Sequence, residues 1–255
     1  MIRNPLFHVV LLSACFICAP AFAEDPATDE RGPLLTDRPG ANDTSRTVGK
    51  KTFQAEIGVD GTFVPDGDQT HLFPLKLKQG ISENFEFHVE TNTYEIVPNG
   101  ESGLSAPEVG TKWHLGHDPD GDMSIGLSTG VIIPILDSQS LVFSSSIASE
   151  FTLTQTMSLG ITVGADVSLS PFDGNNSSAN FALGLSRSWN DQFGSFIDVF
   201  GTTTLSGELS MGSNLGVTYL ITPNLQIDAY ARQGYVNRSD FGAGAGVSFR
   251  LSTKL

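Results

Sequence analysis

The twelve residues from Ser158 to Leu169 alternate strictly between two kinds of side chain. Leu159 and every second residue after it are apolar, whereas Ser158 and every second residue after it are small or polar. Because side chains alternate across a β-strand, this stretch would have one apolar face and one polar face. At about 3.3 Å per residue it is long enough for a tilted strand to cross a bilayer. The pattern predicts a transmembrane strand whose polar face lies toward a lumen.

The same alternation recurs along most of the chain. We expect strands at residues 52–63, 71–79, 85–94, 108–115, 123–133, 141–153, 158–169, 180–189, 195–205, 213–221, 225–233 and 241–251. Short turns alternate with longer Gly-, Asn- and Ser-rich loops between them, as in barrels whose two chain ends both lie in the periplasm. Pro74 predicts a bulge in the second strand, or a strand that begins only after it. The sequence thus predicts an all-β fold, a transmembrane antiparallel up-and-down β-barrel of about twelve strands.

Composition argues against two other classes of protein. Hydrophobic residues make up 39% of the chain. Beyond the N-terminal leader, no apolar run reaches the roughly eighteen residues of a membrane-spanning helix, so a membrane-bound form would cross as a barrel. The formal net charge is −14, and the chain therefore lacks the basic surface that nucleic-acid phosphates need.

Residues 1–23 have the features of a secretory signal peptide. Arg3 supplies the positive start, an apolar segment follows, and Ala21-Phe22-Ala23 forms a cleavage motif. The segment ending at Cys15 also resembles a lipoprotein processing box, so lipidation of Cys15 is the alternative. The two cysteines of the chain, Cys15 and Cys18, both lie in this leader, and we expect no disulfide in the mature protein.

The mature chain divides into an arm and a barrel. Residues 24–50 are polar, rich in Pro, Gly and Asp, and without period, which predicts a periplasmic N-terminal arm. Residues 51–255 contain all the predicted strands and form the barrel domain. Outer-membrane lipid and the barrel assembly machinery are the expected partners of such a domain, and the bacterial outer membrane is its expected location.

Within the arm, the segment Leu35-Thr36-Asp37-Arg38-Pro39-Gly40 precedes Thr44, Ser45 and the first strand. This order resembles the N-terminus of a family of outer-membrane barrels assigned to the meta-pathway of phenol degradation and also labelled transporters. The resemblance continues through residues 74–87, 107–115, 130–134 and 242–251, and so spans most of the mature chain. It implies an outer-membrane barrel that works in transport, and it points to aromatic or hydrophobic solutes.

The polar faces of the predicted strands gather charged and histidine side chains toward the lumen. A mixed lumen of this kind could select a solute, as charged rings do in pores, or its ion pairs could fill a barrel too narrow to conduct. The candidate lumen-lining residues are Glu56, Asp60, Lys76, Lys78, Glu86, His88, Glu90, Glu108, Lys112, His114, Glu150, Asp166, Asp198, Asp228, Arg232 and Arg250.

The arm has two possible positions. Glycines on the inward faces of the later strands leave room in the lumen for a narrow path or for the arm itself. Asp37 and Arg38 could fold back and pair inside the barrel as a partial plug. A solvated periplasmic arm is the alternative, and the sequence does not decide between them.

Catalytic and metal chemistry find little support. No serine stands in a distinctive context beside a histidine, so a lipid hydrolase is the third and least favoured class. His88 with Glu86 and Glu90, and the acidic turn 118–122, are read as a polar strand face and a solvated turn instead of metal ligands. We predict a passive outer-membrane channel for small solutes, neither an enzyme nor a cofactor-binding protein. The alternative is a non-conducting structural or surface-binding barrel that presents the loops 95–106 and 171–178.

Overall fold

A computed structural model describes residues 34–63, 69–91, 94–96, 102–135, 140–169, 177–237 and 240–253, and all structural statements below concern these residues. They contain no helix long and apolar enough to cross a membrane. The strands are β1 (Thr52–Phe63), β2 (Gln69–Leu72), β3 (Leu75–Ser82), β4 (Phe85–Thr91), β5 (Tyr94–Ile96), β6 (Gly103–Leu104), β7 (Glu108–His117), β8 (Met123–Ile132), β9 (Val142–Thr154), β10 (Met157–Ser168), β11 (Ser178–Ser188), β12 (Phe193–Thr204), β13 (Leu209–Thr222), β14 (Leu225–Val236) and β15 (Phe241–Ser252).

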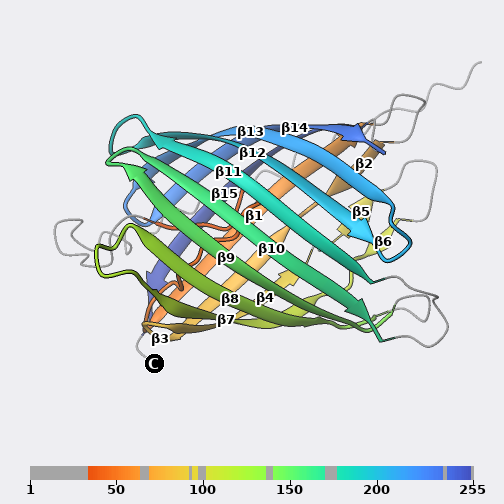
Figure 1. Cartoon of the computed structure of the whole chain (residues 1–255), viewed down its shortest axis with the longest axis horizontal. Helices are drawn as coiled ribbons and strands as arrows, with labels where there is room; N and C mark the ends of the chain where they lie inside the picture. The colour runs from red at the N-terminus through yellow and green to blue at the C-terminus, as the bar shows by residue number, and fades with distance from the viewer. Residues whose placement is uncertain are drawn as a thin grey trace, which may run out of the picture. The chain divides into compact units, whose positions relative to one another are not determined.

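Twelve of these strands close an antiparallel barrel, which confirms the predicted fold (Figure 1). Each long strand pairs with its neighbours along the chain, and the ring closes where β1 pairs with β15 from Thr52 opposite Ser252 to Phe63 opposite Phe241. Closure leaves no long edge strand in the ring, so the backbone polar groups of the wall are satisfied internally, as a membrane requires.

One of the predicted strands is broken in the structure. The segment predicted at 71–79 divides into β2 and β3 around Phe73 and Pro74, because proline cannot donate to the ladder. Of the segment predicted at 85–94, residues 85–91 form β4 and Tyr94 begins β5, while residues 92 and 93 lie outside the described residues. The short strands β2, β5 and β6 pair with one another and with β1, and together they extend one side of the wall.

The two ends of the barrel differ in their connections. At one end, which we call the turn end, residues 83–84, 155–156, 189–192 and 223–224 join β3 to β4, β9 to β10, β11 to β12 and β13 to β14. The first residue of β1 and the last of β15 lie at this end. The connections at the opposite, loop end are partly outside the described residues, as are residues 97–101 and 171–176 of the loops proposed for surface binding.

The outer face of the wall is apolar. Large apolar side chains at odd-numbered positions are 40% to 62% exposed on it: Ile57, Val59, Phe87, Val89, Ile147, Val163, Leu183, Ile197, Leu215 and Ile227. At the turn end, Arg187 lies over the Trp189 ring with Cζ 4.0 Å from the ring centroid, an amphipathic pair suited to a membrane interface. An apolar band of this kind matches the hydrocarbon core of a bilayer.

The core of the molecule is polar. Its largest fully buried side chains are Lys78, Lys112, Gln54, Glu56, Glu86, Thr52, Ser45 and Ser248. Buried charges persist only when they are paired or hydrogen-bonded. Each of these buried charges therefore needs a partner inside the barrel.

Candidate functional site

Residues 34–50, which we call the arm, occupy the interior of the barrel (Figure 1). Their polar atoms contact side chains on β1, β3, β4, β7, β8, β9, β10, β12 and β14, that is, around most of the ring. Contacts on so many strands place the arm within the ring of strands. The structure thus places Asp37 and Arg38 inside the barrel, and not in a solvated arm.

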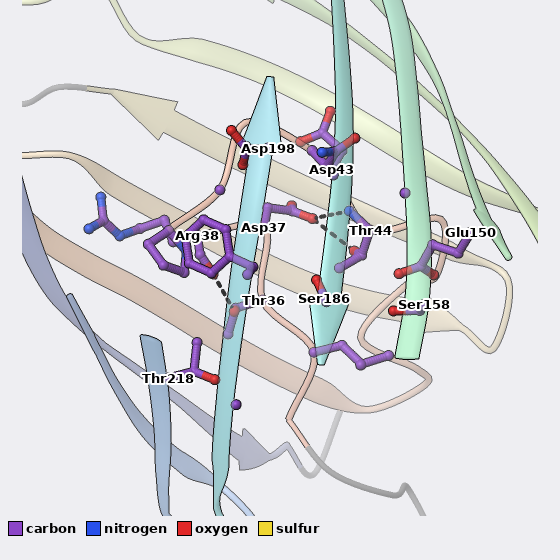
Figure 2. Close-up of a pocket in the computed structure, with 18 of the residues that line it drawn as sticks. Thr36, Asp37, Arg38, Asp43, Thr44, Glu150, Ser158, Ser186, Asp198 and Thr218 are labelled. Atoms are coloured by element: carbon purple, nitrogen blue, oxygen red, sulfur yellow. Dashed lines mark hydrogen bonds between the residues drawn. The ribbon is translucent and has the colours of Figure 1, made fainter. Parts of the chain in front are cut away.

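Asp37 is the centre of the arm's contacts. Its carboxylate oxygens lie 2.7 Å from Lys78 Nζ, 2.9 Å from Lys76 Nζ and 2.9 Å from Lys112 Nζ. Thr44 donates to the same carboxylate from its backbone N–H at 2.9 Å and from its hydroxyl at 2.8 Å, which folds the arm back on itself (Figure 2). One arm carboxylate therefore joins three ammonium groups from two separate parts of the wall.

The three lysines also need the wall's own carboxylates. Lys78 Nζ lies 2.6 Å from Glu56 Oε1, and Lys76 Nζ lies 2.9 Å from Glu90 Oε2. Asp37 and, at 3.8 Å from Lys76 Nζ, Asp43 add two arm carboxylates to these two from the wall. The arm thus contributes to the charge balance of this part of the core.

The pKa of Asp37 reflects this setting. Burial alone would raise the pKa of its carboxyl, because the charged form loses water. Lys112, Lys76 and Lys78 outweigh that effect and hold the Asp37 pKa well below its ordinary value. Asp37 is accordingly ionised whenever the arm is docked at neutral pH.

Arg38 faces the other side of the barrel. Its backbone N–H donates to Glu56 Oε2 at 2.9 Å, and its Nη2 lies 3.6 Å from Asp228 Oδ1 of β14. Gly58 and Gly246 lie beneath its guanidinium, and a Cβ at Gly246 would come within 2.9 Å of Nη2. The missing side chains of these two inward glycines thus make space for Arg38.

The arm then crosses to the far wall and returns to the turn end. Ala41 N–H donates to Asp198 Oδ2 at 3.0 Å, and Asp43 N–H donates to the Thr162 hydroxyl at 3.2 Å. On the return, the Ser45 hydroxyl contacts the Ser124 hydroxyl and donates to Glu150 Oε2 at 2.5 Å, while Val48 N–H donates to Glu86 Oε2 at 2.6 Å. The arm is therefore a loop inserted from the turn end.

Two cavities lie on either side of the arm. The turn-end cavity, about 270 Å³, is lined by Leu34 and Phe196 among others (Figure 2), and the loop-end cavity, about 340 Å³, by Phe200 and Arg232 among others. Both cavities are lined by arm residues 37–40 and by Asp43. The arm is the wall that the two cavities share.

Nine of the predicted lumen-lining residues contact the arm directly. Eight of them hold it by hydrogen bonds or ion pairs already given, and His114 Nδ1 lies 3.1 Å from Ser45 O. The nine are Glu56, Lys76, Lys78, Glu86, Lys112, His114, Glu150, Asp198 and Asp228. Their role in lining a conducting path stays a prediction.

The other seven lie apart from the arm in three places. Asp60 and Arg232 pair at 3.2 Å near the loop end. A smaller cavity of about 210 Å³ is lined by His88, Glu90, Glu108 and Asp166, with His88 Nε2 3.6 Å from Glu108 Oε1. Arg250 Nε donates to Asn224 Oδ1 at 2.6 Å in a turn-end connection. Among the described residues no group of His, Cys, Asp or Glu has the arrangement of a metal site.

Sequence reasoning missed part of the site. The arm residues Asp43, Thr44 and Ser45 also bind the wall, although the sequence analysis singled out only Asp37 and Arg38. Phe196 and Phe200 fall on the polar parity of β12 and line the two cavities. Their position on the polar parity of the strand was the sequence signal that could have identified them as lumen-facing.

These observations define the class of protein: a closed twelve-strand antiparallel β-barrel of the outer-membrane type, apolar outside and polar inside. The chain belongs to the family described as "Putative MetA-pathway of phenol degradation", which matches residues 36–251. The match begins within the arm, and it confirms the resemblance that the arm and strand segments indicate.

Solved structures share the fold. The COG4313 outer membrane channel from Pseudomonas putida F1 aligns with a TM-score of 0.68 at 8% identity, covering 86% of this chain and 100% of that chain. The NanC porin aligns with a TM-score of 0.60 at 12% identity, covering 76% and 100%, and the KdgM porin with 0.56 at 10% identity, covering 76% and 98%. No curated protein matches the chain in sequence.

Proposed function

We propose that the protein is an outer-membrane channel for the passive passage of small solutes, with the arm as its constriction. The observation that carries this proposal is the pair of cavities on opposite sides of the arm, both lined by residues 37–40 and by Asp43. A barrel filled throughout by cross-strand ion pairs would leave no such spaces. Here the wall leaves open volume on both sides of the arm, and arm residues line both spaces.

The surroundings of the barrel follow from its outer face. The apolar band contacts outer-membrane lipid, the turn end lies in the periplasm and the loop end faces the exterior. The barrel assembly machinery inserts the chain after its signal peptide is removed. Residues 1–23, including Cys15, lie outside the described residues.

The solute is small, because the cavities hold only a few hundred cubic ångströms each. Family membership favours aromatic or hydrophobic compounds. The channel neighbours support transport and not catalysis, and the mechanism needs no cofactor: a solute diffuses from one cavity to the other past the arm, whose charges and the wall's set the selectivity.

A non-conducting barrel is the competing function, favoured by the dense contacts between the arm and the wall. Planar-bilayer recording of the refolded full-length mature protein separates the two. We expect discrete single-channel currents that a small aromatic solute partially blocks. A folded protein that stays silent in this recording contradicts the channel.

The matched variant lacks residues 34–48. This deletion removes the arm's polar contacts with the inside of the barrel and leaves β1 intact from its first residue. We expect its currents to be several times larger than those of the intact protein. Equal currents in the two proteins would show that the arm is not the constriction.

A further inference from the structure

Three aromatic side chains lie on the inner face of the barrel, opposite to the lipid-facing set. Phe196 and Phe200 belong to β12, and Tyr230 belongs to β14. Phe196 lines the turn-end cavity, and the other two line the loop-end cavity. Aromatic rings thus line both sides of the arm, on one side of the barrel.

Each ring lies against a glycine on the neighbouring strand. Phe196 is opposite Gly216, Phe200 opposite Gly212 and Tyr230 opposite Gly244. A Cβ at Gly212 would come within 2.8 Å of Phe200 Cζ, a Cβ at Gly244 within 2.6 Å of Tyr230 Cε1, and a Cβ at Gly216 would collide with the Phe196 ring. Because the glycines have no side chain, the rings can lie flat along the wall and leave the lumen open.

The opposite wall is charged, so the interior has two unlike sides. Lys76, Lys78 and Lys112 lie on β3 and β7 with carboxylate partners on β1 and β4, whereas Phe196 and Phe200 lie on β12. Tyr230 on β14 lies between the two sides, and its hydroxyl donates to Asp60. A solute that crosses the barrel near Phe196 and Phe200 avoids displacing the ion pairs of the three lysines. A path beside these phenylalanines therefore costs less free energy than a path that displaces the lysine ion pairs.

The arm passes this route at Gly40. A Cβ on Gly40 would lie 3.0 Å from Asp198 Oδ2 and 3.6 Å from Phe196 Cε2, so only backbone stands at the point where the arm meets the aromatic side. Asp198 itself is 2% exposed and lines the turn-end cavity. Its Oδ2 accepts from Ala41 N–H, and its Oδ1 has no hydrogen-bond partner among the described residues. An acceptor is thus available beside the narrow point.

We propose that Phe200, Tyr230 and Phe196 form a track for a planar aromatic ring that carries an N–H or O–H donor. The ring stacks along the track from the loop-end cavity to the turn-end cavity, passes Gly40, and its donor is accepted by Asp198. This proposal rests on the proposed channel function and adds to it the path and the selecting residues. Aromatic pairs prefer offset or edge-to-face contact, which a saturated ring of the same size cannot reproduce.

The test compares two organic cations of similar size, benzylammonium and cyclohexylmethylammonium, by bi-ionic reversal potentials in planar bilayers at neutral pH. Both carry the same donor and charge, so the comparison isolates the aromatic ring. We expect benzylammonium to be roughly twofold to tenfold more permeant through the intact protein, the range that corresponds to an aromatic pair. We expect the F196L/F200L double variant to lose this preference.

The matched control is Phe181→Leu on β11. Phe181 also lies against a glycine, since a Cβ at Gly201 would be 2.6 Å from Phe181 Cε1, but it belongs to the lipid-facing set. F181L should keep the preference for benzylammonium. Heat-modifiable electrophoretic mobility shows that each variant is a folded barrel.

The outcomes separate the two proposals. A preference that survives in F196L/F200L, or equal permeation of the two cations through an intact protein that conducts K⁺, overturns the track and leaves the channel standing. A folded intact protein without K⁺ conductance overturns the channel and the track together.

Discussion

At the scale of single residues, Asp37 determines whether the arm stays inside the barrel. It is buried, and three lysine ammonium groups lie within 2.7 to 2.9 Å of its oxygens. Removing one partner from a buried ion pair is more costly than never having had the pair, because the remaining charges are left in a poorly solvated site. Docking of the arm therefore depends on this carboxylate more than on the arm's other hydrogen bonds.

Asp37→Asn tests this dependence. The amide has nearly the same shape but no charge, and the loss should weaken arm docking by roughly 3 to 5 kcal/mol. We expect larger single-channel currents and faster proteolysis of the arm. Asp43→Asn is the control, because Asp43 has a partly exposed side chain with one lysine at 3.8 Å, and it should change little. Equal effects of the two substitutions would contradict the central role of Asp37.

The depressed pKa of Asp37 gives a pH dependence of defined sign. A carboxyl whose pKa is lowered on docking stabilises the docked arm fully above its ordinary pKa of about 4, and loses that contribution as the pH falls through the lowered value. Conductance should therefore stay constant from about pH 5 to pH 8 and rise only in stronger acid. Recording across this range checks it, and an opening near neutral pH would contradict the assignment of this control to Asp37.

At the scale of elements, the close approach of the arm to the wall depends on glycines. Gly126 of β8 lies under the Ser45 carbonyl, and a Cβ there would be 2.9 Å from Ser45 C. Gly80 of β3 lies against Gly49 in the same way, and Lys51 N–H donates to Gly80 O at 3.2 Å. The strands can accept alanine at these positions, whereas the arm cannot keep its place above it.

Gly126→Ala should therefore displace the arm without unfolding β8, since alanine is tolerated in a strand better than glycine by roughly 0.5 to 1 kcal/mol. We expect increased conductance with normal heat-modifiable mobility. Gly103→Ala, where a Cβ meets nothing within 4 Å, is the control. Indistinguishable currents for the two variants would show that Ser45 is not held at Gly126.

A covalent link tests whether the arm moves. The Ser45 and Ser124 hydroxyls touch, so cysteines at these two positions are within reach of a disulfide. In the Asp37→Asn background, we expect the oxidised S45C/S124C protein to show the small currents of the intact channel, and reduction to restore the large ones. Large currents in both states would mean that D37N acts through the wall and not through the arm.

At the scale of the whole molecule, the interior is acidic. The inward candidates comprise nine carboxylates against five Lys and Arg side chains, and the arm adds only one net positive charge, from Asp37, Asp43, Arg38, Arg46 and Lys50. We expect cation selectivity, measured as the reversal potential in a KCl gradient. It should weaken as salt rises, because the screening length falls to about 3 Å at 1 M. Anion selectivity would contradict the placement of these carboxylates along the path.

The barrel could be predicted from the alternation along the strands, because lipid on one side and a polar interior on the other impose a period of two on every strand. Proline at 74 marked one break for the same physical reason that the structure shows. The sequence did not decide whether the arm lies inside the barrel or in solvent, since Asp37 pairs with lysines that lie 39 to 75 residues further along the chain. Phe196 and Phe200 were overlooked because an apolar ring on the polar parity is unexpected until its glycine partner across the ladder is known.

The arm reaches β1, β3, β4, β7, β8, β9, β10, β12 and β14, and the strand closing the ring follows them all in synthesis. Its binding site is therefore complete only when β15 has paired with β1. We therefore expect the arm to become resistant to added protease only when the barrel has closed, so that its protection reports a complete ring.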